Sequence, residues 1–198
     1  MAVTAPRVAT RRLEAASADD ELLVEEVAGL VNRAYALGES GLWLDGWSRI
    51  TPAEVAEAIR DGEMLVATVE GRMAGCAHVR RLDATIADLG LVSADPDQRG
   101  RGVGRELVRA AEELMRSRGL TTAQLELLVP EGRVHPEKDR LRAWYSRLGY
   151  RVVRTAPFEE VATHAASQLA TRCEFLVFQK PLSPRARSGD RTRPARGC

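Results

Sequence analysis

Two hydrophobic periods alternate along the chain. Apolar residues recur every three or four positions over residues 21–35 and 104–118, which predicts two helices that each bury one face. The first buried face is predicted to comprise Leu22, Leu23, Val27, Leu30, Val31 and Ala34. Apolar runs of the strand type cover residues 12–16, 64–69, 73–80, 85–92, 123–129, 150–154 and 174–180.

Local signals between these runs indicate an α+β (mixed α/β) fold around one sheet. Thr51-Pro52-Ala53-Glu54 is a capping box with proline in the first turn, and it predicts a helix to about Arg60. Glu70-Gly71-Arg72 is a hairpin signal, so three successive strands are expected to pair antiparallel. Further helices are expected at 138–148 and near 158–169.

The two ends of the chain differ from its middle. Residues 183–198 contain five arginines, one aspartate and almost no apolar side chains, and residues 1–10 carry no core pattern. We therefore predict disordered segments at 1–10 and 183–198 around a single domain at 11–182. The net charge is +1 at pH 7, so the domain without its basic tail is slightly acidic, which argues against a nucleic-acid partner.

No apolar run is long enough to span a membrane or to form a secretory signal, so no membrane partner is expected. The cysteines, Cys76, Cys173 and Cys198, are widely spaced and odd in number. This usage is typical of a reducing cytoplasm, and it argues against a disulfide framework or a metal site. We therefore expect a cytoplasmic protein.

The most specific chemistry lies at residues 92–104, between a strand and a helix. The strand run ends before Pro96, and glycines follow at positions 100, 102 and 104. Glycines have no side chain that shields the main chain, so the N–H groups of such a turn can converge on an oxyanion. The positive end of the next helix also attracts the anion. A phosphate suits such a turn best.

Spacing decides which phosphate ligand fits. A nucleoside-triphosphate loop needs lysine and a hydroxyl residue after its last glycine, and a dinucleotide fingerprint that begins at Gly100 needs glycine where the chain has Arg105. Neither pattern is met. Arg99, Gly102 and Gly104 instead match R-x-x-G-x-G after a strand that ends V-x-A-x-P. The segment resembles the acyl-coenzyme A signature of the GNAT superfamily of N-acyltransferases; a purely structural turn is the alternative.

A second segment is similar to the other signature of that superfamily. Residues 140–150 read as a helix that ends at a glycine before a strand, with Tyr145 four residues ahead of Gly149. The family often has asparagine seven residues before this tyrosine, where the present chain has Lys138. We expect Lys138 or Arg140 to reach a phosphate of the coenzyme instead.

The resemblance implies a central, mostly antiparallel sheet of about six or seven strands that is splayed at the acyl-CoA site and flanked by helices. Acetyl-CoA is the implied co-substrate. In the family, its pantetheine lies along the strand before the glycine turn, which here implies contacts with the main chain of Val92 and Ala94. The implied pyrophosphate turn comprises Arg99, Gly100, Arg101, Gly102, Val103 and Gly104.

Acyl transfer to an amine needs a base, because an alkylammonium with a pKa near 10.4 costs roughly 4–5 kcal/mol to deprotonate at pH 7. Asp88 and Glu126 interrupt apolar runs on the two strands where the family places its bases. We favour Glu126, since leucines flank it on both sides. An outward-facing acid paired with arginine is the alternative for each, and His135 is a weaker candidate.

Tyr145 matches the general acid of the family. A phenol with a pKa near 10 can protonate a departing thiolate with a pKa near 8.5 at a modest cost of about 2 kcal/mol. The alternative is a tyrosine that only packs beside Trp144.

The resemblance places the acceptor beside residues 32–47, where Glu39, Trp43 and Trp47 are candidate substrate contacts, joined by His135. We expect an N-acetyltransferase that acts on a small-molecule amine by direct attack. A protein lysine or N-terminal acetyltransferase and a non-catalytic acyl-CoA sensor are the alternatives. The fold of the family often dimerises, which leaves a homodimer open.

Overall fold

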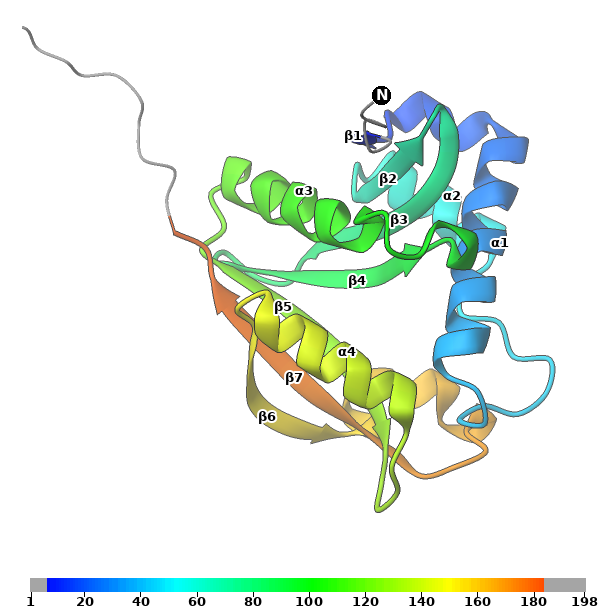
Figure 1. The fold of residues 1–198 in the computed structure, drawn as a ribbon, viewed down its shortest axis with the longest axis vertical. Coiled ribbons are helices and arrows are strands. Elements are labelled where there is room, and N and C mark those ends of the chain that lie inside the picture. Colours follow the sequence, from blue (N-terminus) through cyan, green and yellow to red (C-terminus); the bar gives the residue numbers. More distant parts are fainter. Residues whose placement is uncertain (1–6, 184–198) are drawn as a thin grey trace, which may run out of the picture.

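The computed structural model describes residues 7–183, apart from the side chain of His164, and folds them around one seven-stranded sheet (Figure 1). The strand order is β1-β2-β3-β4-β5-β7-β6. The strands are β1 (Val8–Arg12), β2 (Met64–Val69), β3 (Arg72–Arg81), β4 (Ile86–Ala94), β5 (Thr122–Pro130), β6 (Arg151–Pro157) and β7 (Cys173–Pro181). Only the β4–β5 pair is parallel within this range, so the predicted mostly antiparallel α+β fold is confirmed.

Helices cover both faces of the sheet (Figure 1). The helices are α1 (Glu21–Gly38), α2 (Pro52–Arg60), α3 (Val103–Ser117), α4 (Pro136–Arg147) and α5 (Phe158–Ala162), with short 3-10 helices at Ala15–Asp19, Pro96–Gln98 and Thr163–Gln168. α1 and α2 share one hydrophobic core with the sheet, whereas α3 and α4 share another on the opposite face. No helix within residues 7–183 is both long and apolar enough to cross a membrane.

The predicted local signals form as expected. The Thr51 hydroxyl accepts from the N–H of Glu54 at 3.3 Å, and the Glu54 carboxylate accepts from the N–H of Thr51 at 2.8 Å. This reciprocal pair is the capping box that begins α2. Glu70 and Gly71 both have positive φ, 53° and 79°, which is the geometry of the tight turn that joins β2 to β3.

The sheet opens between β4 and β5. These strands pair only from Ile86 to Asp88, opposite residues 122–124, whereas β5 pairs with β7 along its whole length. Beyond Asp88, β4 therefore has one edge without a neighbouring strand. The gap connects the α1/α2 face of the sheet with the α3/α4 face, and it is the splay that the resemblance implied.

A β-bulge bends β4 inside this gap. Cys76 of β3 pairs with Ser93, but His78, two residues further along, pairs with Gly90, so β4 carries an extra residue between them. Leu91 lies at this point with φ of 49°, which is unusual for a branched side chain.

Two details of the sequence prediction are wrong. The first strand is Val8–Arg12 rather than 12–16, and residues 15–19 form a 3-10 helix. Arginines occupy this edge strand, so its hydrophobic pattern is weak. Leu22 lies in the first turn of α1 and is 79% exposed, away from the buried face.

The strand at Val8–Arg12 also moves the start of the folded chain ahead of position 11. Residues 1–6 of the predicted N-terminal extension, and the predicted tail from 184 on, lie outside the described residues. The rest of the proposed division of the chain stays a prediction.

Candidate active site

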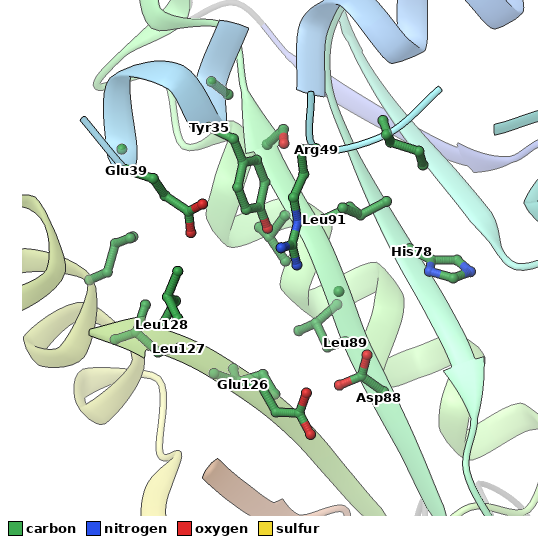
Figure 2. A pocket seen from close by; sticks show the side chains of 18 of the residues that line it. Tyr35, Glu39, Arg49, His78, Asp88, Leu89, Leu91, Glu126, Leu127 and Leu128 are labelled. Atoms are coloured by element: carbon green, nitrogen blue, oxygen red, sulfur yellow. The ribbon is translucent and has the colours of Figure 1, made fainter. Parts of the chain in front are cut away.

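A cavity of about 720 Å³ lies on the α1/α2 face of the sheet, where β4 and β5 diverge (Figure 2). Asp88 of β4 and Glu126 of β5 project into it from opposite sides of the gap. Their neighbours along each strand belong to the core beneath α3: Ala87, Leu89, Leu125 and Leu127. Because successive side chains of a strand alternate between faces, the structure brings both sequence-predicted carboxylates to the cavity.

Asp88 has the more unusual environment of the two acids. Its Oδ1 is buried and has no hydrogen-bond partner among residues 7–183. Desolvation, and then the nearby charge of Glu126, raises the pKa of the Asp88 carboxyl from 3.8 to about 7. Gly90 leaves room for this group, since a Cβ at Gly90 would lie 3.3 Å from Asp88 Oδ2. The carboxyl of Asp88 is thus poised to exchange a proton near neutral pH.

Glu126 is half-buried, and Gln124 donates a long hydrogen bond of 3.5 Å to it. Desolvation raises the pKa of its carboxyl, while the charges of Arg80, Arg154 and Arg49 lower it. The more exposed Glu126 is therefore the weaker candidate for a base, contrary to the preference drawn from the flanking leucines.

Tyr145 reaches the gap from the other face. It lies on α4, is buried, and packs in the core beneath α3 with its ring centroid 4.8 Å from that of Trp144. Its side chain lines the cavity. Desolvation, together with the proximity of Tyr35 and Asp88, raises the pKa of the Tyr145 phenol. Tyr145 therefore stays protonated across the physiological range.

The glycine turn presents free donors at the start of α3. The first helical hydrogen bond runs from the N–H of Glu106 to the carbonyl of Gly102 at 3.0 Å. The N–H groups of Val103, Gly104 and Arg105 precede it and have no partner in the helix. They point out of the positive end of α3, as an anion site requires.

Two glycines of this turn are needed for its shape. Gly100 and Gly102 both have φ of 81°, in the left-handed region. Gly104 has a different role, because a Cβ there would lie 3.4 Å from the ring of Trp144. The two predicted signature segments thus meet where the start of α3 packs on α4.

The open edge of β4 carries main-chain groups that face the gap. The N–H of Asp95 donates to the carbonyl of Ala74 on β3 at 2.9 Å. Main-chain groups alternate between the two edges of a regular strand, so those of Ser93, which pairs with Cys76, also face β3, and those of Ala94 face away from it. Val92 precedes Ser93 and lies in the bulge. An extended ligand can add to this edge in the manner of a strand.

Glu39 and Lys138 form a buried ion pair at 2.8 Å, with both side chains 4% exposed. The Glu39 carboxylate also accepts from the indole N–H of Trp43, which stacks on Trp47 with ring centroids 3.8 Å apart. The expected phosphate contact of Lys138 is therefore not supported, because a buried ammonium must keep its counter-ion. Glu39 and Trp43 line the cavity as predicted, but their polar groups already have partners.

His135 and Arg140 are not part of the cavity wall. His135 Nε2 lies 3.2 Å from the carbonyl of Ser40, so this histidine joins the loop before α4 to the loop after α1. Arg140 is exposed and pairs with Glu137 on its own helix. The predicted roles of His135 toward substrate and of Arg140 toward phosphate have no support in this geometry.

A profile of the acetyltransferase (GNAT) domain matches residues 60–152. The matched stretch contains the open edge of β4, the glycine turn, both carboxylates and Tyr145. Residues 60–152 of the chain are thus a GNAT acetyltransferase domain. The chain is accordingly an acyltransferase, in a family whose acyl donor is acetyl-CoA.

Solved GNAT structures share the fold at low sequence identity. The ribosomal-protein-S18-alanine N-acetyltransferase from Escherichia coli is 19% identical, with a TM-score of 0.58 over 93% of this chain and 99% of that chain. An aminoglycoside 6'-N-acetyltransferase complexed with coenzyme A is 16% identical, with a TM-score of 0.66 over 90% and 99%. Ard1 from Thermoplasma volcanium is 18% identical, with a TM-score of 0.62 over 89% and 98%. A search of curated proteins found no match.

Three further residues of this GNAT cavity were missed by sequence reasoning: Tyr35, Arg49 and His78 (Figure 2). Tyr35 and Arg49 precede the segment that the GNAT profile matches. His78 Nε2 lies 2.8 Å from a carboxylate oxygen of Glu63. No local pattern in the sequence links these positions, because the chain brings them together only through α1, its following loop and β3.

Proposed function

We propose that this GNAT acyltransferase transfers the acetyl group of acetyl-CoA to a primary amine of a small molecule by direct attack. One observation carries the proposal: a titratable carboxyl, Asp88, and a protonated phenol, Tyr145, line one gap between β4 and β5 from opposite faces of the sheet. A thioester carbonyl in the gap would have a base on the amine side and an acid on the sulfur side. The two faces of the sheet thus separate the two substrates.

Asp88 is the proposed base. An alkylammonium bound beside it must lose a proton before the nitrogen can attack, and a carboxylate with a pKa of about 7 accepts that proton at a smaller cost than an ordinary aspartate. Glu126, across the gap, keeps the pKa of Asp88 high and adds negative charge that attracts the ammonium. Asp88 passes the ammonium proton to solvent, and as the new N–C bond forms its carboxylate takes the second proton that the nitrogen loses.

Tyr145 is the proposed acid. When the C–S bond breaks, the electron pair stays on sulfur, and the Tyr145 hydroxyl supplies the proton that yields free coenzyme A. Burial raises the pKa of this phenol. A thiolate in the same gap is desolvated as well, which raises the pKa of the coenzyme thiol, so the difference between the two pKa values changes less than either value does. The second proton on Asp88 replaces, through solvent, the proton that Tyr145 gave to sulfur. The first ammonium proton is the one net proton that the reaction releases.

The proposed donor site joins three features of the chain. The N–H groups at 103–105 would hold the pyrophosphate, and Arg99 and Arg101 would add positive charge at the surface. Val92 and Ala94 would bind the pantetheine arm through their main chain. Acetyl-CoA supplies the activated acyl group, and every other contribution here comes from the protein.

A small acceptor is favoured over a peptide because the loop after α1 closes one side of the cavity. Leu44 donates its N–H to the carbonyl of Gln168 at 2.8 Å, and Ala170 donates to the carbonyl of Leu42 at 2.9 Å. These bonds join the loop to the segment before β7, which Figure 1 shows beside it. Trp43 of this loop also makes an edge-to-face contact with the ring of Phe158 on α5. An extended peptide would need this side open.

The test compares turnover with donor binding. Tyr145→Phe should lower kcat by about 100-fold or more, while calorimetry shows that coenzyme A binds with nearly unchanged affinity. The matched control is Tyr150→Phe, since Tyr150 lies in the same core and outside the cavity wall. Acetylation is followed by release of free thiol over a panel of amines. Full activity of Tyr145→Phe would remove the proposed acid, and coenzyme binding without acetylation of any amine would favour the sensor alternative.

A further inference from the structure

The proton chemistry of the cavity gives no role to Arg49. Its guanidinium lies in the cavity wall, 4.9 Å from the ring centroid of Tyr35 and 6.0 Å from that of Trp47 (Figure 2). Asp88 and Glu126 face the same cavity, yet no carboxylate of residues 7–183 forms an ion pair with Arg49. The guanidinium of Arg49 is therefore available to an anionic group of a ligand in the cavity.

The main chain at Arg49 is fixed in place by one side chain of α1. Asn32 Oδ1 accepts from the N–H of Arg49 at 2.8 Å and from that of Ile50 at 3.1 Å. Asn32 Nδ2 donates to the carbonyl of Ile50 at 2.9 Å. With the aromatic contacts at the other end, these bonds hold the guanidinium in position before any ligand arrives. A positioned group loses less conformational freedom on binding than a mobile one.

The other cations along the cavity do not offer the same site. The Lys138 ammonium is bound to Glu39, and Arg80 and Arg99 are exposed to solvent. Among the described residues that line the cavity, Arg49 is thus the half-buried arginine or lysine without a carboxylate in ion-pair contact. Arg49, Asp88 and Glu126 all line this cavity, so its wall carries a positively charged group and two acidic groups.

We propose that the acceptor is an amine that also carries a carboxylate, an amino acid or a close relative, and that Arg49 binds this carboxylate. Two N–H groups of a guanidinium match the two oxygens of a carboxylate, which gives both strength and orientation. Asp88 and Glu126 receive the ammonium end of the same molecule. The inference rests on the proposed function, because it needs the amine beside Asp88.

The experiment compares matched acceptors. Wild-type protein is assayed by free-thiol release with acetyl-CoA and the proteinogenic amino acids, their carboxamides, the corresponding decarboxylated amines and aminoalkylphosphonates. We expect kcat/KM for the preferred amino acid to exceed that for its carboxamide by about 10- to 100-fold. Arg49→Gln should abolish this preference, and Arg49→Lys should keep part of it. Arg33→Gln, an exposed change on α1, should leave it intact.

Each other outcome has a distinct meaning. Equal kcat/KM for an amino acid and its carboxamide in the wild type, or a preference that survives in Arg49→Gln, overturns the inference. Acetylation of no amino acid, or preferred acetylation of a phosphonate, also overturns the carboxylate assignment. The proposed function survives these results if amines without a carboxylate are acetylated. It fails by itself if calorimetry finds no binding of acetyl-CoA.

Discussion

Replacing Asp88 by asparagine should make the protein more stable and less active at once. Burial and the charge of Glu126 raise the pKa of the Asp88 carboxyl from 3.8 to about 7, so the folded protein binds this proton more tightly than the unfolded chain does. Above pH 7 the ionised carboxylate therefore costs roughly 4 kcal/mol of folding free energy. As the pH falls from 7 toward 4, protonation of the folded protein removes that cost.

An amide side chain carries no charge, so Asp88→Asn should recover part of the cost. We expect a gain of about 2 kcal/mol at pH 8, which corresponds to a rise in Tm of roughly 4–8 °C for a chain of this size. At pH 5 the carboxylate costs only about 1.5 kcal/mol, which is no more than the roughly 2 kcal/mol that the amide fails to recover, so the gain should disappear. The same variant lacks the proposed base, and its kcat/KM should fall by about 100-fold or more.

Thermal unfolding followed by circular dichroism at pH 5 and pH 8 measures the first effect, and free-thiol release measures the second. Asp45→Asn, an exposed aspartate in the loop after α1, is the matched control and should change neither. A lower Tm for Asp88→Asn than for wild type at pH 8 would refute the reasoning. An increase of equal size at both pH values would refute it as well, because the effect would then not arise from ionisation.

Three further changes test other parts of the account. Glu126→Gln removes the charge that raises the pKa of Asp88, so the acidic limb of the kcat/KM pH profile should move to lower pH; an unmoved limb would contradict the coupling. Gly102→Ala places a side chain at φ of 81°, at a cost of about 1–2 kcal/mol, and calorimetry should show coenzyme A affinity reduced about 10-fold. Lys138→Met leaves Glu39 as a buried unpaired charge and should lower the free energy of unfolding by about 3–5 kcal/mol in urea, with partial recovery when Glu39→Gln is added.

The features that the sequence predicted correctly have local causes. The glycine turn is recognisable because free N–H groups, positive φ and a helix start must occur within a few residues. Successive side chains of a strand point to opposite faces of the sheet. Because the apolar neighbours of Asp88 and Glu126 lie in the core beneath α3, the two acids lie on the opposite face. The capping box at Thr51 is equally local, and α2 begins where it predicts.

The acceptor side depends on contacts between distant segments, which a single sequence does not encode in a readable pattern. The Lys138 ammonium meets Glu39 across 99 positions of the chain, so the lysine expected to bind phosphate is instead an ion-pair partner. Arg49 gains its place from Asn32 and Tyr35 on α1. The preference for Glu126 as base also came from local context, whereas the raised pKa of Asp88 arises from its burial in the folded protein and from the charge of Glu126 on another strand.

A crystal structure with coenzyme A bound tests the central claim most directly. The account predicts the pyrophosphate on the N–H groups of residues 103–105, the pantetheine arm along Val92 and Ala94, and the sulfur within hydrogen-bonding distance of the Tyr145 hydroxyl. A coenzyme that binds outside the gap between β4 and β5, or a sulfur remote from Tyr145, would contradict it.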